Sequence, residues 1–374
     1  MKIAIDARGA TWYSGTGIGT YTENLIKELI HIDNKNYYHI YWSGRNYNIL
    51  EKENTKILMT SKKHKRFFQC NYFPSNIEKE QIDLYHVPQN GIGLAENITC
   101  KKVATIHDLI PYIMPETVGK SYLIKFLKQM PYIIENCDGL LTVSEYSKKD
   151  ILKFFPIDPN KIFVTPLAAN KRYKPLDKER CKFVIRKHYN INKPFILYLG
   201  GFSNRKNVKS LIEAFSKIYN KLNEEYLLVI LGSYRSEGKP LLKLCDKLNI
   251  NSNVCFTGFV PDKFLPVFYN ACDVFVYPSL YEGFGLPPLE AMSCGTPVIT
   301  SNTTSIPEVV GDSSVLINPL NITELSNAMT NVLCNDNLKK ELRIKGLKRC
   351  KLFSWKKTAQ NTLNAYKKIV NPDL

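Results

Sequence analysis

Short apolar stretches alternate with amphipathic ones along the first half of the chain. The stretches that predict strands are KIAIDAR, YYHIYWS, DLYHV, KVATIHD and GLLTVS. Between residues 17 and 33, apolar side chains recur every three or four positions, which predicts a helix with one buried face. Further helices are expected near 120–136 and 145–155. Strands that alternate with helices in this way are typical of a parallel sheet covered on both faces.

The same alternation restarts after residue 190. The strands expected there are FILYLGG, YLLVILG, VCFTGF, VFVYPS, PVITS and VLINP. Helices are expected from Asn207, near 238–248, near 262–271 and from about Pro288. Two such runs predict an α/β protein with two doubly wound, Rossmann-like domains.

The expected domains are residues 1–170 and 190–354, joined by a polar, charge-rich linker at about 171–189. The last segment, 355–374, is amphipathic, and we expect it to form a helix that packs back on the first domain. Doubly wound folds bind ligands beyond the carboxyl ends of their strands, so the site is expected where two such domains face each other across a cleft.

Length and composition indicate a cytoplasmic protein. The 374 residues are 44% hydrophobic and 23% charged, enough for two ordinary cores. No apolar run approaches the ~20 residues that cross a bilayer. Asp6 and Arg8 interrupt the first apolar stretch, where a signal peptide would continue. The ten cysteines include no Cys-x-x-Cys pair, so free thiols in a reducing compartment are expected.

The charge balance narrows the range of partners. The chain carries 51 Lys and Arg against 34 Asp and Glu, a formal net charge of +17, and a cationic surface attracts anions. Nucleotides, nucleic acid and anionic lipid all qualify, so a basic nucleic-acid- or membrane-binding protein without catalysis is one hypothesis. No Asp-x-Asp or His-Glu-x-x-His motif is present, so no metal site is expected.

Two loops in the first half carry candidate chemistry. SGTGIGTY, residues 14–21, precedes the first helix; around Gly17 its backbone amides can face an anion, although a turn without a ligand has the same composition. The next strand ends in WSGRN without an acidic residue, which disfavours a nicotinamide dehydrogenase. TIHDLIP places His107 and Asp108 at a strand end. A histidine there can donate a hydrogen bond to a sugar hydroxyl or transfer a proton, and a pair with a purely structural role is the alternative.

Two loops in the second half suggest a diphosphate and sugar site. In GGFSNRKNV, Arg205 and Lys206 stand where a helix dipole disfavours cations, which makes sense if a diphosphate binds there. EGFGLPPLE brackets a stiff turn with Glu282 and Glu290, and a carboxylate is a good ligand for vicinal hydroxyls. Gly285 and its neighbours allow backbone amides to face a ligand.

In this order the motifs resemble the retaining glycosyltransferases of family 4, which have the two-domain GT-B fold. The resemblance covers nearly all of the chain, and its most specific element is EGFGLPPLE followed by AMSCGTPVITSNTTSIPEVVGDSSVLINP. Supporting stretches are DARGATWYSGTGIGTYTENL, IHDLIPYIMPE, TVSEYSKKDI, YLGGFSNRKN and GFVPDKFLPVFYNACDVFVYPS. The stretches IHDLIPYIMPE and RKN most resemble the corresponding stretches of members that use GDP-mannose. This resemblance favours mannose as the transferred hexose.

The resemblance implies a role for each motif residue. Glu290 would bind the nucleotide ribose and Glu282 the donor sugar, while Arg205 and Lys206 would hold the diphosphate. His107 would face the sugar near the reacting centre. The other implied substrate-binding residues are Gly283, Phe284, Gly285 and Leu286 at the donor sugar, Phe259 and Val260 at the base, and Gly17 and Asp108 on the phosphate and acceptor side. GGFSN lacks the arginine that many members carry there, so Arg205 would supply that charge alone.

No acid stands out as a nucleophile on the acceptor side, and similar enzymes are described as reacting on one face of the sugar. The departing diphosphate would take the acceptor proton, stabilised by Arg205, Lys206 and a helix dipole. The expected activity is therefore a retaining, metal-independent transfer with no cofactor besides the nucleotide diphosphate sugar as co-substrate. A GT-B sugar-nucleotide epimerase is the enzymatic alternative, but it would need a second carboxylate at the substrate carbon.

The acceptor is inferred from the basic, aromatic segment 62–73. It combines Lys62, Lys63, Lys65 and Arg66 with Phe67, Phe68, Tyr72 and Phe73. This composition predicts contact with an anionic membrane surface, although a solvated loop is an equal alternative. With the resemblance, it implies a glycan or polyprenyl-linked acceptor in bacterial surface polysaccharide or lipopolysaccharide biosynthesis. The protein would lie on the inner face of the cell membrane, with no nucleic-acid partner.

Overall fold

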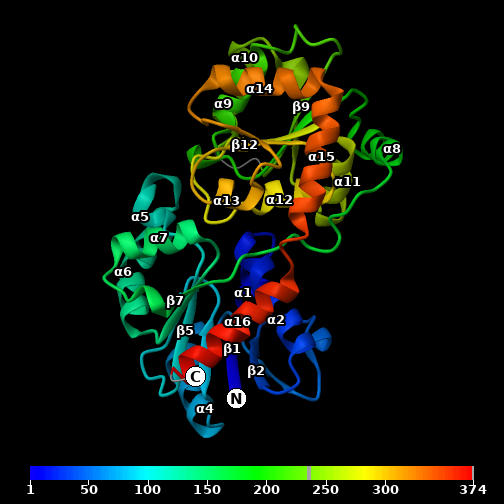
Figure 1. Cartoon of the computed structure of the whole chain (residues 1–374). Coiled ribbons are helices and arrows are strands. Elements are labelled where there is room, and N and C mark those ends of the chain that lie inside the picture. Colours follow the sequence, from blue (N-terminus) through cyan, green and yellow to red (C-terminus); the bar gives the residue numbers. More distant parts are fainter. Residues whose placement is uncertain (234–236, 373–374) are drawn as a thin grey trace. The chain divides into compact units, whose positions relative to one another are not determined.

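The computed structural model describes residues 1–233 and 237–372 and divides into two compact units (Figure 1). Unit 1 comprises Met1–Leu167 and Ser354–Leu374, and unit 2 comprises Ala168–Phe353. Each unit contains one sheet of parallel strands. The two doubly wound folds expected from the alternation of strands and helices are confirmed.

Seven strands form the sheet of unit 1, in the order β3-β2-β1-β4-β5-β6-β7. They are β1 (Lys2–Asp6), β2 (Tyr37–Trp42), β3 (Thr55–Met59), β4 (Leu84–Val87), β5 (Lys101–Ile106), β6 (Gly139–Thr142) and β7 (Ile162–Val164). The apolar pattern did not single out β3 and β7, because these edge strands bury few of their side chains and so carry no continuous apolar run.

The helices of unit 1 lie on both faces of its sheet. They are α1 (Gly9–Trp12), α2 (Gly17–Ile32), α3 (Lys65–Phe67), α4 (Phe73–Lys79), α5 (Ile110–Ile113), α6 (Lys120–Asn136), α7 (Glu145–Phe154) and α16 (Trp355–Val370). Short turns are the 3-10 segments Asn48–Leu50, Pro115–Thr117 and Pro159–Lys161 and the π-helical segment Phe68–Tyr72. The helices α5, α6 and α7 gather on one side of the sheet (Figure 1) and share a core with β5 and β6.

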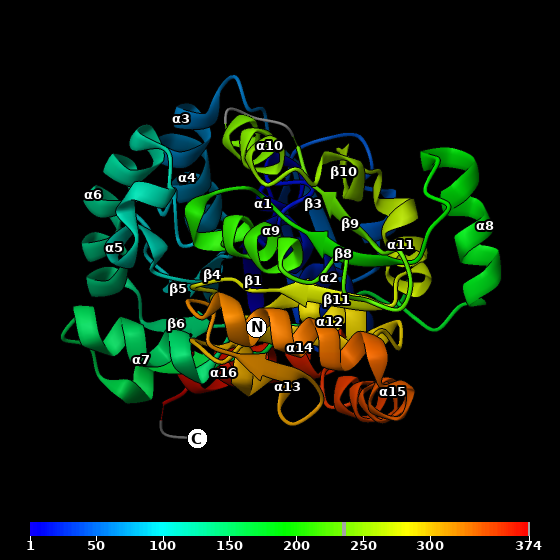
Figure 2. The same cartoon turned by 90° about the horizontal axis from the view of Figure 1, so that it is seen from above.

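Six strands form the sheet of unit 2, in the order β10-β9-β8-β11-β12-β13. They are β8 (Phe195–Leu199), β9 (Leu227–Leu231), β10 (Val254–Gly258), β11 (Val274–Tyr277), β12 (Val298–Ser301) and β13 (Val315–Ile317). Figure 2 shows β8, β9 and β11 side by side at the centre of this sheet.

Helices also cover both faces of the second sheet, with α9 and α14 on one face and α12 and α13 on the other (Figure 1). The helices are α8 (Lys178–Tyr189), α9 (Val208–Ser216), α10 (Gly238–Lys247), α11 (Leu265–Ala271), α12 (Leu286–Ser293), α13 (Ile306–Val310), α14 (Ile322–Cys334) and α15 (Asp336–Cys350). The 3-10 turns are Asn204–Lys206, Asn251–Asn253 and Asp262–Phe264.

The strand order reverses once in each sheet, between β1 and β4 in unit 1 and between β8 and β11 in unit 2. In doubly wound folds, the loops that follow the two strands beside such a reversal leave toward opposite faces of the sheet. We call this place the switch point of each unit. It is where a doubly wound fold binds its ligand.

The segment 171–189, expected as a linker, belongs to unit 2. Its second part forms α8, which packs on α11. Its first part is tied to the same helix, because Asn270 accepts a hydrogen bond from the Leu176 amide at 2.7 Å and donates to the Lys174 carbonyl at 3.0 Å. The polar composition of this segment therefore marks an exposed helix face and not a free connection.

The C-terminal helix α16 belongs to unit 1 and packs against α2 and β6. Tyr366 Oη lies 2.6 Å from His86 Nδ1, His86 Nε2 lies 2.7 Å from Thr105 Oγ1, and Thr105 Oγ1 lies 3.0 Å from Tyr21 Oη. Burial, and then the charge of His107, lowers the pKa of His86 to about 3, so the ring is neutral at pH 7. This buried network joins α16 to β4, β5 and α2.

Among the described residues, no helix combines the length and the apolar character that crossing a bilayer requires.

We expect Tyr366→Phe to lower the free energy of unfolding of unit 1 by about 1–3 kcal/mol, because the ring stays while the buried His86 Nδ1 loses its hydrogen bond with Tyr366 Oη. Hydrogen–deuterium exchange of α16 measures the loss. Lys368→Ala, at an exposed position of the same helix, is the control and should change stability by less than about 0.5 kcal/mol. Equal protection of α16 in both variants would contradict the prediction.

Candidate active site

An acid and two cations meet at the switch point of unit 2. Glu282 Oε1 accepts hydrogen bonds from Arg205 Nη1 at 3.0 Å and from Lys206 Nζ at 2.6 Å. The cations come from the turn after β8 and the acid from the loop after β11, the strands that flank the switch point. The three side chains are only 12–15% exposed. The structure thus brings Glu282 together with two adjacent cations, of which Arg205 is 77 positions away in the sequence.

Residues that the sequence analysis missed complete this cluster. Tyr277 Oη donates to Glu282 Oε1 at 2.9 Å, and Ser279 Oγ donates to the same oxygen. Lys206 Nζ also donates to Tyr277 Oη at 2.5 Å. The sequence contained a signal for them, because VFVYPS carries hydroxyl side chains at Tyr277 and Ser279. Side chains two positions apart point to the same side of an extended chain.

The pKa of Glu282 is lowered to about 2. Burial alone would raise it, but the charges of Lys206 and Arg205 and the hydrogen bonds from Lys206 and Ser279 outweigh burial. The carboxylate is therefore ionised at every physiological pH, and it neutralises one of the two cations beside it.

The turn between the two glutamates is held by the loop after β12. Ser305 Oγ donates to the carbonyls of Glu282 at 2.8 Å and Phe284 at 2.9 Å. Gly285 has φ +113°, and a Cβ there would lie 2.6 Å from Ile306 Cδ1, so only glycine fits. Gly283, Phe284 and Gly285 are buried, and Leu286 is half-buried.

Helix α12 begins at Leu286, two residues before the expected start, because the glycine at position 285 caps it. Glu290 consequently lies in the second turn of α12 and not in the first. It is half-buried, and Tyr269 Oη donates to its Oε2 at 3.2 Å. Burial raises the pKa of Glu290 to about 7, against the opposing effects of Tyr269 and the Arg172 charge. The two glutamates of the motif thus have different partners and opposite pKa shifts.

Two further residues expected near the base follow the edge strand β10. The Phe259 side chain is 74% exposed, whereas that of Val260 is 5% exposed. An exposed apolar ring at the carboxyl edge is available to a planar ligand.

In unit 1, His107 follows β5 and is held on several sides. Its Nε2 donates to the Pro88 carbonyl at 2.9 Å, and its amide donates to Asn90 Oδ1 at 2.8 Å. The ring meets the edge of Tyr21 at 4.7 Å between centroids. Burial lowers the pKa of His107 to about 4, so the ring is neutral at pH 7. Because a carbonyl only accepts, the proton is on Nε2 and Nδ1 is an acceptor.

Asp108 and Gly17 have local structural roles. Asp108 Oδ1 accepts from the Ile110 amide at 3.2 Å at the start of α5. Gly17 is exposed and begins α2. The one-turn helix α1 lies between the first strand and the glycine-rich loop. Within it, Gly19 is required, since a Cβ there would lie 2.2 Å from the Tyr13 carbonyl oxygen.

The segment 62–73 is not the uniform basic and aromatic surface that its composition suggested. Phe73 is fully buried and stacks on Tyr41 at 4.1 Å between centroids, because the segment folds into two short helical turns that lead into α4. Lys65 Nζ lies 5.5 Å from the centroid of the Trp12 ring. The exposed members at its start are Lys62, Lys63, Arg66 and Phe67.

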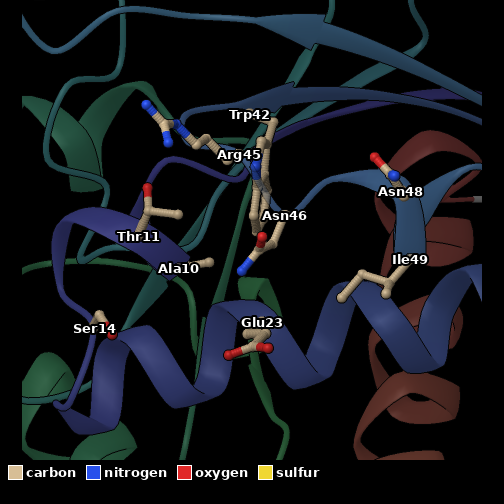
Figure 3. Close-up of a pocket in the computed structure, with 9 residues that line it drawn as sticks. All are labelled: Ala10, Thr11, Ser14, Glu23, Trp42, Arg45, Asn46, Asn48 and Ile49. Atoms are coloured by element: carbon tan, nitrogen blue, oxygen red, sulfur yellow. The ribbon is translucent and has the colours of Figure 1, made fainter.

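A pocket of about 590 Å³ opens beside α1 and α2 of unit 1 (Figure 3). Its lining residues are Ala10, Thr11, Ser14, Glu23, Trp42, Arg45, Asn46, Asn48 and Ile49. In Figure 3 the side chains of Trp42 and Asn46 point toward the helix that carries Glu23. Hydroxyl, amide, carboxylate and indole groups around one hollow suit a polyhydroxylated ligand.

Within residues 1–233 and 237–372, no group of three or more His, Cys, Asp or Glu side chains is arranged to hold a metal ion. All ten cysteines are free.

Comparison with known proteins covers both units. Residues 15–171 match the family described as Glycosyltransferase Family 4, and residues 182–349 match Glycosyl transferases group 1. The chain is 34% identical over 267 residues to the O-antigen chain mannosyltransferase B of Escherichia coli, a match that covers 71% of this chain and 70% of that protein. It is 31% identical over 281 residues to the serotype-specific mannosyltransferase WbdA of Escherichia coli, covering 74% of this chain but only 34% of that longer protein.

Solved structures share the fold of the whole chain. The sucrose-phosphate synthase of Thermosynechococcus elongatus has a TM-score of 0.76 at 21% identity, with 99% of both chains covered. WaaG, a glycosyltransferase involved in lipopolysaccharide biosynthesis, has a TM-score of 0.72 at 15% identity, with 99% of this chain and 100% of that chain covered. The GT-B fold expected from the sequence motifs is confirmed.

The raised pKa of Glu290 predicts that unit 2 loses stability as the pH rises from about 4.5 to about 7. In this window the folded state keeps a proton that the unfolded state has released, so raising the pH favours unfolding. Because Glu290 is partly exposed, we expect a total loss of about 1–2 kcal/mol. Glu290→Gln should remove it and make unit 2 more stable than the wild type at pH 8.

Urea unfolding of unit 2, followed at pH 5 and pH 8, measures this effect. Glu179→Gln, which changes an acid on α8 that is 79% exposed, is the control and should keep the pH dependence of the wild type. A Glu290→Gln variant with the same pH dependence as the wild type would refute the assigned pKa.

Proposed function

The chain belongs to the family 4 glycosyltransferases, and from that premise we propose that it transfers a hexose, with mannose favoured, from a nucleoside diphosphate sugar to a glycan. The observation that carries the proposal is the meeting of Arg205, Lys206 and Glu282 at the switch point of unit 2. The names of the mannosyltransferase relatives support mannose as the sugar and surface polysaccharide as the product. We propose GDP-mannose as the donor on the same grounds.

The donor diphosphate takes the place that the Glu282 carboxylate occupies between the two cations. Arg205 offers a fork of donors and Lys206 a point charge. Helix α9 begins two residues after Lys206, and the amides of its first turn have no acceptor within the helix. Once phosphate oxygens compete for these cations, Glu282 is released to accept hydrogen bonds from hydroxyls of the donor sugar. The amides of Gly283, Phe284, Gly285 and Leu286 line that sugar.

The nucleoside lies along the remaining site residues of unit 2. Glu290 binds the ribose hydroxyls as a carboxylate, which its pKa of about 7 permits at and above neutral pH. The backbone at Phe259 and Val260 meets the base, and the exposed Phe259 ring is beside it.

His107 acts in unit 1 as a neutral hydrogen-bond acceptor. Its Nε2 proton is committed to the Pro88 carbonyl, so Nδ1 accepts a hydrogen bond from a hydroxyl of the transferred sugar. This differs from the expected donor and proton-transfer roles, which a pKa of about 4 disfavours. Asp108 and Gly17 act on the acceptor side by shaping the loops that carry these groups.

Transfer proceeds with retention on one face of the sugar. As the bond from the anomeric carbon to the diphosphate oxygen breaks, the acceptor oxygen bonds to that carbon and its proton passes to the departing phosphate. Arg205, Lys206 and the amino end of α9 stabilise the charge that develops there, which is electrostatic preorganisation. We propose that the reaction needs no metal ion, because these groups supply the positive charge.

The acceptor glycan is proposed to occupy the pocket beside α1 and α2, whose lining of hydroxyl, amide and indole groups suits sugar hydroxyls (Figure 3). Lys62, Lys63 and Arg66, with the exposed Phe67, are proposed to hold the protein on the anionic inner face of the cell membrane, where a polyprenyl-linked acceptor would lie.

A panel of GDP, UDP, ADP and dTDP tests the donor site, because a ligand that binds only the folded state stabilises it. We expect GDP to raise the melting temperature most, by about 5–10 °C at one hundred times its Kd. Glu290→Ala should weaken GDP binding about 10- to 100-fold through the lost charged hydrogen bonds. Glu282→Gln should keep GDP binding within about threefold and slow transfer at least about tenfold, because the cations stay in place.

Glu179→Gln serves again as the matched acid-to-amide control and should change neither property. Transfer should be unaffected by EDTA. A flat response to all four nucleotides, together with binding to polynucleotide that falls steeply with salt, would refute the transferase and favour a basic binding protein. Equal losses of binding and transfer in both glutamate variants would contradict their separate roles.

Membrane contact predicts that Lys62→Glu, Lys63→Glu and Arg66→Glu together reduce co-sedimentation with phosphatidylglycerol vesicles at least about 30-fold, since each basic residue near an anionic surface contributes about 1 kcal/mol. The control reverses three lysines exposed on α10, Lys239, Lys243 and Lys247, and has the same net charge. Equal losses in the two triple variants would show that only total charge matters.

A further inference from the structure

The switch point of unit 1 holds a second cluster of charges that the proposed function does not use. Arg8 follows β1 and Gln89 follows β4, the two strands that flank this point. Arg8 Nε and Nη2 donate to the two oxygens of Asp6 at 2.6 Å each, and Gln89 Nε2 donates to Asp6 Oδ2 at 2.6 Å. Both members of this ion pair have side chains that are 0% exposed. Asp6 therefore fixes and neutralises the guanidinium.

Two lysines from other elements add positive charge beside this pair. The Trp12 ring lies 4.7 Å from Arg8 Cζ and 5.5 Å from Lys65 Nζ, measured to the ring centroid, so both cations share one aromatic platform. Lys125, on α6, is half-buried beside Lys65. The pKa of Lys125 is lowered to about 8, by burial first and then by the charges of Lys65 and Arg8.

The cluster has more positive charge and more donors than the protein satisfies. In the part of the chain that the structure describes, no acid forms an ion pair with Lys65 or Lys125. Arg8 Nη1 is also buried without a hydrogen-bond partner. Crowded like charges and unused buried donors destabilise a fold, so stability does not explain them.

The cluster borders the proposed reaction site of unit 1. Tyr122, one turn before Lys125 on α6, has its Oη 3.4 Å from Asn90 Nδ2, and Asn90 Oδ1 accepts from the His107 amide. The other titratable groups that face this area are Tyr13 and Tyr85, which burial and the Asp6 charge keep protonated, and Asp108, which acts on Tyr122. A group bound among the cations is thus close to the residue that faces the transferred sugar.

We propose that Arg8, Lys65 and Lys125 form a binding site for an anionic group, a phosphate or a carboxylate, that the acceptor carries near the sugar to be extended. The assignment to the acceptor rests on the proposed function, because unit 2 supplies the groups for the donor. Arg8 Nη1 offers one fixed donor, and the two ammonium groups offer charge that can follow the anion. An anion here satisfies the unused Arg8 Nη1 donor and reduces the repulsion between the lysines.

Protection of individual lysines from an amine-reactive ester, read by peptide mass spectrometry on the full chain at pH 7.5, tests the site. Without added anion, Lys125 should react at least about tenfold faster than Lys128, which is exposed on the same helix, because its lowered pKa leaves more neutral amine. Inorganic phosphate should slow Lys125 at least threefold relative to chloride of equal ionic strength and leave Lys128 unchanged. Lys65→Gln should abolish this protection, whereas Lys128→Gln should not.

Separate arms identify the source of the anion. Protection by phosphate indicates a phosphorylated acceptor, and protection by acetate indicates a carboxylate. Protection by phosphatidylglycerol vesicles without protection by either soluble anion would overturn the proposal and place Lys125 on a lipid-facing surface. No protection beyond that of chloride would also overturn it.

The same spectra report on the donor site. GDP should protect Lys206 from the amine-reactive ester. If GDP does not protect Lys206, the proposed function is contradicted, and the result at Lys125 is unaffected. As a second measurement, Lys125→Gln should raise the KM for the acceptor at least tenfold and leave the KM for the donor within twofold, whereas Lys128→Gln should change neither. Equal effects on both KM values would overturn a role specific to the acceptor.

Discussion

All strands of each sheet run in parallel, and the rest of the chemistry depends on that constraint. Parallel pairing places the carboxyl ends of all strands at one edge of the sheet. Residues that follow different strands therefore meet at this edge, even when they are far apart in the sequence. The reversal of strand order then selects one place along the edge where loops diverge. Arg205 contacts Glu282 in unit 2, and Arg8 and Gln89 both bond Asp6 in unit 1, because each pair follows the two strands at that place.

The two switch points share a charge pattern. In unit 2, one buried acid stands against two cations, and in unit 1 Asp6 stands against Arg8 with two lysines nearby. Each cluster is therefore net positive while its acid is ionised. A small part of the formal charge of +17 is thus concentrated at the two switch points, where it attracts an anionic ligand.

The two glutamates of EGFGLPPLE illustrate how environment assigns chemistry to identical side chains. Glu282 is next to two cations and has a pKa of about 2, so it is a permanent carboxylate. Glu290 lies among tyrosines with weaker compensation, and its pKa of about 7 lets it change charge near neutrality. The stiff turn between them keeps these environments separate, and it requires glycine at position 285 because φ is +113° there. A motif with two equivalent acids thereby provides two different groups.

The sequence by itself determined the alternation of strands and helices, the loops that carry polar chemistry, and the family. These features are local: hydrophobic period, glycine positions and short motifs are visible within a few residues. Only the tertiary structure decided which face of 62–73 is buried, that 178–189 is a helix, and that Lys65 and Lys125 lie together. It also decided that His107 is a neutral acceptor and that Glu290 titrates near pH 7. Burial and charge at a side chain depend on residues distant in sequence, and no local pattern records them.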